Sequence, residues 1–118
     1  MKAMSKPEKI ENILNMFEDA ANKHAEATTM GDYKTVNKSY TIIANAVSKL
    51  KSQNQLESLS LFLDSSSDGV KIWAATHLLP LHEKKAISVL EEIEKQGGIF
   101  SLDAETTLDE WRKGTLIL

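Results

Sequence analysis

Three histidines are the residues of this chain best suited to proton transfer or metal binding. His24 falls among the apolar positions of one expected helix, which favours a partly buried, structural side chain. His77 follows Trp73 by four residues, so the two rings share a helix face, either at an interface or in ordinary helix packing. His82 comes just after Pro80 in an expected loop. No two histidines are four residues apart and there is no cysteine, so we expect neither a metal site nor a cofactor.

Carboxylates are abundant, but their pattern is that of solvated helix faces. Glu91 and Glu92 share an expected helix with Lys95, which is spaced for an i,i+4 pair with Glu91. Asp109 and Glu110 extend the acidic character to the next helix. General acid–base catalysis needs carboxyl groups that are desolvated in a cleft, and this pattern does not indicate one.

Motifs for a nucleophile or for phosphate binding are absent from the sequence. The serine run 65–67 lacks the Gly-x-Ser-x-Gly frame of a nucleophile elbow. The pair Gly97-Gly98 stands alone as a helix stop, outside any glycine-rich phosphate loop. We therefore expect a binding protein and not an enzyme.

Charge is unevenly distributed along the chain, whose net charge is −3. Residues 1–54 carry eight lysines and six acidic residues, whereas residues 55–118 carry six basic and eleven acidic residues. The acidic half argues against direct nucleic-acid binding and suits a basic protein partner, or is a solvated face that keeps the protein in solution. A nucleic-acid-processing enzyme is a weaker alternative, which would depend on four lysines of the second expected helix: Lys34, Lys38, Lys49 and Lys51.

The terminal and apolar segments indicate where the protein resides. The first residues contain no apolar stretch like that of a secretory leader. The longest apolar runs fall far short of the ~20 residues that cross a bilayer. The lack of cysteine fits a reducing compartment. We expect a cytoplasmic protein that does not contact membranes.

A helical period runs through the chain and positions these side chains. Apolar residues recur every three or four positions over 10–28 and 33–50, which predicts a long antiparallel helix hairpin over 5–53. Helix caps are predicted at three residues, two of them followed by glutamate at the third position after the cap: Ser5, Asp32 and Asn54. The aromatic residues expected in the core are Phe17, Tyr40, Phe62 and Trp111.

Residues 55–114 are predicted to form further helix pairs, followed by an apolar tail over 115–118. The expected helices span about 55–63, 68–79, 82–96 and 101–113. No segment shows the sustained alternation typical of a sheet. The chain is therefore predicted to be one all-α domain over 1–118, with about six helices as stacked antiparallel hairpins and the tail packed on the last one.

Two stretches resemble HEAT-type helical repeats. In Leu63–Leu79 an aspartate-containing turn precedes Val70-Lys71 and the small pair Ala74-Ala75, which lets another helix approach closely. The segments 90–98 (Leu-Glu-Glu-Ile, then Gly-Gly) and 107–114 (Thr-Leu-Asp-Glu-Trp-Arg-Lys-Gly) are similar to a family of small bacterial HEAT-like proteins. The resemblance covers about half of the chain and implies a HEAT- or armadillo-like right-handed superhelix.

Small, acidic, all-helical proteins of this kind also resemble immunity proteins of bacterial toxin systems, including contact-dependent growth inhibition. That resemblance implies a cytoplasmic inhibitor that binds a basic toxin domain, commonly a nuclease, and blocks its active site. The alternative is a HEAT-like scaffold or regulatory module that binds another protein without a toxin partner. Exposed acids and one aromatic pair are the candidate partner-binding residues: Asp64, Asp68, Trp73, His77, Glu91, Glu92, Asp109 and Glu110.

Overall fold

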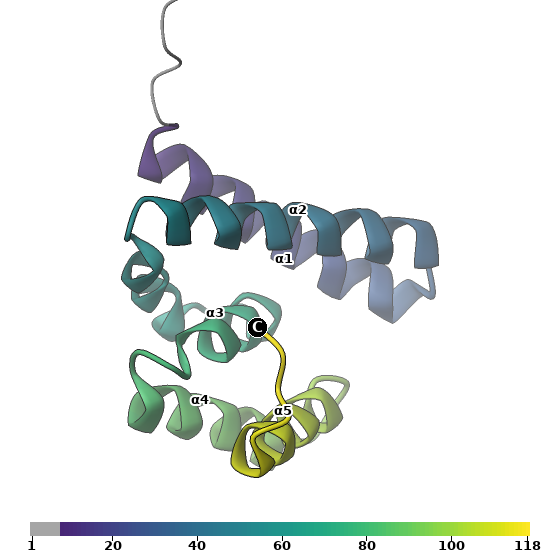
Figure 1. The fold of residues 1–118 in the computed structure, drawn as a ribbon. Helices are drawn as coiled ribbons and strands as arrows, with labels where there is room; N and C mark the ends of the chain where they lie inside the picture. The colour runs from purple at the N-terminus through teal and green to yellow at the C-terminus, as the bar shows by residue number, and fades with distance from the viewer. Residues whose placement is uncertain (1–7) are drawn as a thin grey trace, which may run out of the picture.

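Helix hairpins stacked in tiers form the chain in a computed structural model that describes residues 8–118 (Figure 1). The elements are α1 (Ile10–Met30), α2 (Tyr33–Ser52), the 3₁₀-helix η1 (Leu56–Asp64), α3 (Asp68–Leu78), α4 (Glu83–Gln96) and α5 (Ser101–Lys113). No strand occurs among these residues, so the all-α prediction is confirmed. Over the same residues, no helix has both the length and the apolar character needed to span a membrane.

The α1–α2 hairpin is the upper tier and overhangs the shorter helices beneath it (Figure 1). Gly31 closes α1 in the left-handed conformation at φ 71°. Asp32 caps α2 as predicted, because its carboxylate accepts from the Thr35 N–H at 3.2 Å and from the Thr35 hydroxyl at 2.7 Å. These hydrogen bonds lower the pKa of Asp32, since they favour the charged carboxylate.

Of the other two predicted caps, one lies outside the described residues and the other differs from the prediction. Ser5 lies outside the described residues, but its expected partner Glu8 precedes α1 and pairs with Lys49 of α2 at 2.8 Å. Asn54 ends α2 instead of opening η1: its φ is 57°, and the following N–H donates to the Leu50 carbonyl at 2.8 Å. Asparagine suits both places, because it caps helices and also tolerates the left-handed conformation.

The third helix is a 3₁₀-helix, which places residues three apart on one face. Leu59 and Phe62 share such a face and are buried, whereas Leu61 is exposed. The Phe62 ring stacks on Phe17 of α1 at a centroid distance of 5.6 Å. This aromatic contact holds η1 beneath the upper hairpin.

Helix α3 meets α1 at a contact between small residues. A Cβ placed on Gly69 would lie 2.7 Å from the Cβ of Ala25 and 3.4 Å from the carbonyl oxygen of Ala21. Ala74 and Ala75 are also fully buried, as the small-residue pattern predicts. The tightest approach to α1 is therefore at Gly69, in the first turn of α3.

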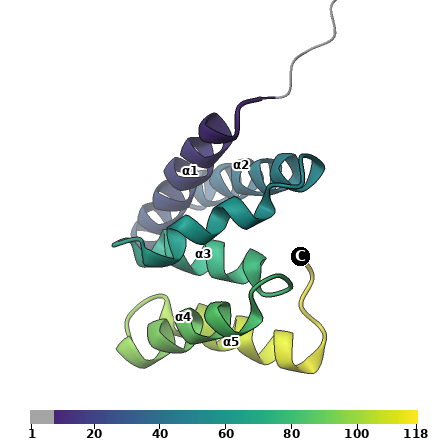
Figure 2. The same ribbon diagram turned by 90° about the vertical axis from the view of Figure 1, so that its left-hand side faces the viewer.

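Helices α4 and α5 form the lower hairpin, beneath α3 (Figures 1 and 2). The Trp111 indole N–H of α5 donates to the Glu83 carboxylate of α4 at 2.8 Å. In the last turn of α5, the guanidinium of Arg112 lies 3.2 Å from the carboxylate of Glu91 of α4. These two contacts and the buried side chains between the helices fix the pairing of α4 with α5.

One apolar core joins the tiers, but two expectations about its edge are wrong. Phe17 and Phe62 are buried as predicted and Trp111 is partly buried, whereas Tyr40 is 54% exposed and contacts the core only through the edge of Trp73. The tail does not simply pack on α4–α5: it rises from the end of α5 toward α2 and α3 (Figure 2). Leu116 packs on the core, while Ile117 and Leu118 border a cavity at α2 and α3.

Candidate functional site

The eight candidate residues fall into three separate places. The first two lie at the turn into α3, the aromatic pair lies on α3, and the last four lie on α4 and α5. Asp64 is exposed, and Asp68 pairs with Lys71 at 3.7 Å within the first turn of α3. This turn is attached to α1 by a 2.8 Å hydrogen bond from the Ser67 hydroxyl to Asn22. The two aspartates thus belong to a different part of the surface from the acids of the lower hairpin.

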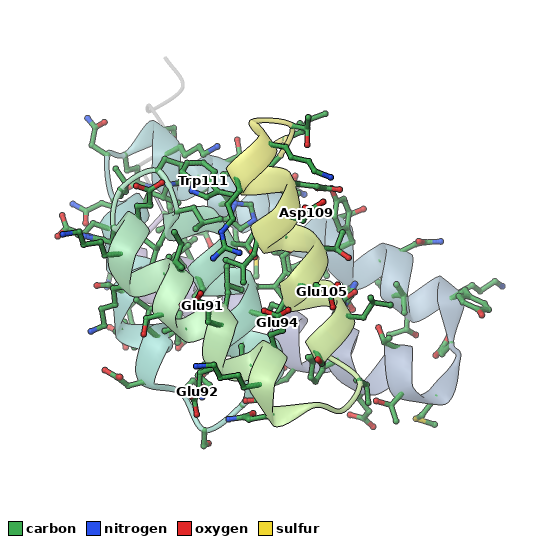
Figure 3. The ribbon with its side chains drawn as sticks, turned by 90° about the horizontal axis from the view of Figure 1, so that it is seen from below. Glu91, Glu92, Glu94, Glu105, Asp109 and Trp111 are labelled. Atoms are coloured by element: carbon green, nitrogen blue, oxygen red, sulfur yellow. The ribbon has the colours of Figure 1, made fainter. Side chains whose placement is uncertain are left out.

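Carboxylates from α4 and α5 converge in a groove between the two helices (Figure 3). This acidic groove, defined by Glu94, Glu105 and Asp109, has a volume of about 350 Å³, and Arg112 is the cation in its wall. Asp109 pairs with Lys113 at 2.8 Å. Glu94 and Glu105 have no ion-pair partner within residues 8–118.

The predicted acids contribute unequally to this groove. Asp109 lines it, and Glu91 flanks it in its pair with Arg112. Glu92 lies on the side of α4 away from α5 (Figure 3). Glu110 is partly buried, and its carbonyl accepts from the N–H of Thr115 at 2.9 Å, which closes α5. The structure therefore brings only two of these four residues to the groove.

The two unpaired acids of the groove, Glu94 and Glu105, were not among the sequence-based candidates. The sequence gives only a coarse signal for them, which is that both lie within five residues of the turn between α4 and α5. Residues at equal distances on either side of the turn of an antiparallel hairpin lie opposite each other. Counting outward from the turn at Gly97–Phe100 places Glu94 opposite Asp103, two residues before Glu105, so this count does not identify Glu105.

A second feature is the cluster of rings around Trp73, which the upper hairpin covers. Trp73 makes edge contacts with His24 of α1 at 5.2 Å and with Tyr40 of α2 at 5.8 Å, measured between ring centroids. It stacks on His77, one turn along α3, at 6.2 Å and an interplanar angle of 13°. The aromatic cluster thus connects three helices, and Trp73 packs between α3 and the upper hairpin.

Both histidines of the cluster are held in the neutral form at pH 7. Burial and, to a smaller extent, the nearby Lys51 ammonium together lower the pKa of His77 to about 4. Burial also lowers the pKa of His24, against a smaller opposing effect of Asp103. The Nδ1 atom of His77 is buried without a hydrogen-bond partner, which makes protonation there costly.

Trp73 lines two cavities. The first, of about 400 Å³, lies between α2, α3 and the tail, with Tyr40, Lys51 and His77 in its wall. The second, of about 390 Å³, lies between α1, α3 and α5, with His24 and Asp103 in its wall. Sequence patterns do not reveal these cavities, because they arise where the overhanging hairpin crosses the lower tiers.

The donor chemistry of both surfaces suits binding. Over residues 8–118, no three side chains of metal-binding type converge on one point. The acidic groove offers carboxylates without ion-pair partners, and each cavity beside Trp73 has a mostly apolar wall with one charged side chain, Lys51 or Asp103. These are recognition features: one is electrostatic and the other is apolar.

Comparison with known proteins identifies the fold. No family model matches the chain, and no curated protein matches it. A solved structure does: the chain is similar to the protein RPA1889 from Rhodopseudomonas palustris CGA009, with a TM-score of 0.87 and 20% sequence identity, over 99% of each chain. At this identity the likeness shows a shared fold alone, and it extends over the whole arrangement of helices.

Proposed function

We propose that the protein is a cytoplasmic immunity protein, which binds a basic toxin domain of the nuclease class through its acidic groove and blocks the toxin's active site. The observation that carries this proposal is the convergence of Glu94 and Glu105, from two helices, with no ion-pair partner for either among residues 8–118. Residues 83–113 carry eight acidic and five basic side chains, so the lower hairpin has a net charge of −3.

The physical argument rests on charge complementarity. Carboxylates that face each other across a groove repel, and a partner's lysine or arginine side chains relieve that repulsion. The active site of a nuclease is lined with such side chains, because it holds a phosphate backbone. An acidic groove can therefore occupy that cleft in place of the nucleic acid.

Capture from the native host provides the test, with the partner identified by mass spectrometry and its nuclease activity then assayed with and without this protein. We expect a basic partner whose activity is inhibited, with affinity that falls as salt rises. The double variant Glu94→Lys/Glu105→Lys should weaken binding at least about tenfold through the loss of two charge contacts. The variant Glu11→Lys/Glu26→Lys on α1 changes the net charge equally and should bind normally. Equal weakening by both variants would contradict a specific role for the groove.

The turn before α3 allows a separate test of the remaining candidate acids. If Asp64 and Asp68 contact the same partner, Asp64→Lys/Asp68→Lys should also weaken binding while the protein stays folded. Binding by this variant at wild-type strength would confine the interface to the lower hairpin.

A HEAT-like scaffold or regulatory module is the second candidate, and the tiered stack of helix pairs favours it, because such stacks present extended binding surfaces. Its partner would also be basic, since the groove is the same. A captured partner with no toxic activity, bound through Glu94 and Glu105, would support the scaffold and exclude immunity.

A further inference from the structure

The second cavity beside Trp73 has a largely apolar wall that reaches the protein surface. It lies between α1, α3 and the start of α5, and its volume of about 390 Å³ exceeds that of any single side chain. Its apolar lining residues are Ile72 and Trp73 of α3, with Phe100 and Leu102 at the start of α5. Leu102 is 68% exposed, so the cavity is open to solvent at α5. A large side chain of another molecule therefore has room to enter.

This cavity adjoins the acidic groove on the surface of α5. Thr106 lines both of them and is exposed. Glu105 of the groove immediately precedes Thr106, and Asp103 of the cavity lies three residues before it, which is about one helical turn. A partner that lies across Thr106 would therefore contact the cavity and the groove at the same time.

The cavity and the groove together are negatively charged. Glu94, Asp103 and Glu105 have no ion-pair partner within residues 8–118. Among the same residues, no lysine or arginine lines the cavity, and only Arg112, which is already in an ion pair, lines the groove. His24 also lines the cavity, but burial lowers its pKa, so it is neutral at pH 7. This surface therefore favours a basic partner over an acidic one.

The open cavity and the acids beside it together determine which kind of side chain fits. Protein interfaces gain most of their affinity from a few large side chains, often aromatic, that fill pockets near the centre of the interface. Trp73 and Phe100 are aromatic residues of the cavity wall, and aromatic rings make favourable edge or offset contacts with one another. The cavity thus suits an aromatic side chain whose neighbours in the partner are basic.

We infer that the basic partner of the acidic groove inserts an aromatic side chain, flanked by lysine or arginine, into the cavity between α1, α3 and α5. The inference rests on the proposed function, because it takes the partner's basic side chains to lie in the groove. It adds the chemistry of the contact: the inserted ring supplies most of the affinity, and the carboxylates orient the segment that carries it.

The test uses two five-residue peptides with blocked ends as probes. Both have lysine at four positions, and the central residue is phenylalanine in one and alanine in the other. We expect the phenylalanine peptide to bind the full chain at least about tenfold more tightly, because burial of the ring adds to the charge contacts. A third peptide, with phenylalanine among four glutamates, should not bind.

Titrations followed by NMR spectroscopy measure these affinities and locate the peptides. The phenylalanine peptide should shift the indole N–H resonance of Trp73, which lines the cavity. The indole N–H of Trp111 donates to Glu83, and Trp111 lines neither the cavity nor the groove, so its resonance should stay in place. Both lysine peptides should shift the amide resonances of Glu94 and Glu105, because the charge contacts do not need the ring.

Two neighbouring threonines of α1 provide matched variants. Thr28 lines the cavity and Thr29 does not, while both are exposed and each hydroxyl donates to the carbonyl four residues earlier. Thr28→Phe should fill the cavity and reduce the affinity for the phenylalanine peptide to that for the alanine peptide. Thr29→Phe should bind both peptides as the wild type does. Circular dichroism checks that both variants fold.

The outcomes separate this inference from the proposed function. The inference is overturned, and the groove is kept, if the two lysine peptides bind equally or if Thr28→Phe binds the phenylalanine peptide unchanged. Equally tight binding of the glutamate peptide would also overturn it, because charge would then play no part. If neither lysine peptide binds, the groove does not attract basic chains, and the proposed function fails together with the inference.

Discussion

In the aromatic cluster, the side chain of His77 is neutral in the folded protein, and protonating it would destabilise the fold. His77 stacks on Trp73 as a neutral ring, and its Nδ1 has no partner to stabilise a proton. An imidazolium there would be poorly solvated and close to the positive charge of Lys51. The residue that is most suggestive of chemistry in the sequence is thus a neutral packing group, whose ionisation opposes folding.

Acid should therefore destabilise the protein through His77. The unfolded chain binds this proton near pH 6.5 and the folded chain only at about 4, so stability is lost as pH falls through that interval. At pH 5 the loss from this group is about 2 kcal/mol. Urea unfolding at pH 7.5 and pH 5 measures it. His77→Phe should remove most of this difference, whereas His82→Gln should keep it. An undiminished acid loss in His77→Phe would assign the effect to another group.

At the scale of elements, hydrophobic spacing determined most of what could be predicted. The segments expected at 68–79 and 82–96 form helices at Asp68–Leu78 and Glu83–Gln96, because their apolar steps of three and four admit few alternatives. The type of the third helix could not be predicted. Leu59 and Phe62 are three apart, a spacing that suits both an α-helix and a 3₁₀-helix.

The candidate site was less accessible to prediction, for a physical reason. Local hairpin pairing places Glu94 opposite Asp103, so it locates this end of the α4–α5 hairpin but not the pairing of Glu94 with Glu105. The contacts of Trp73 with His24 and Tyr40 depend on how the upper hairpin crosses α3, which is set by packing between distant segments. Helical periodicity predicts which face of a single helix is buried, but it does not predict the angle at which two distant helices cross.

The contact between α1 and α3 gives a prediction about element packing. Gly69→Ala should destabilise the fold by about 1–3 kcal/mol, because its Cβ would overlap that of Ala25. The double variant Gly69→Ala/Ala25→Gly removes the opposing methyl group. Its loss of unfolding free energy should therefore be smaller than the sum of the losses of the two single variants. Chemical denaturation of the four proteins gives the coupling free energy. A value near zero would mean that the helices shift apart without cost.

The whole molecule is a stack in which each tier packs mainly on its neighbours. Helix α1 contacts α2 and α3, and α3 contacts α4, whereas α5 packs mainly on α4. The fully buried residues of α5 are only Ala104 and Leu108. In such a linear arrangement, local stability depends on nearest-neighbour interfaces, so the two ends need not unfold together.

Native-state hydrogen exchange should therefore resolve two levels of opening. We expect the amides of α5 to exchange through an opening of lower free energy than those in the middle of α1 and α2. Leu108→Ala, which costs about 2–5 kcal/mol at a buried site, should accelerate exchange in α5 and α4 more than in the upper hairpin. Leu50→Ala in α2 is the matched change, since both leucines are buried, and it should lower protection in α1 and α2 most.

The pattern of the two variants distinguishes a divisible stack from a single cooperative unit. If the tiers open separately, each leucine lowers protection mainly in its own hairpin. If the continuous core makes the fold all-or-none, both variants lower the protection of every slowly exchanging amide by the same free energy. The second outcome would contradict the nearest-neighbour description. The first would mean that the lower hairpin, which carries the acidic groove, can adjust to a partner while the upper hairpin stays folded.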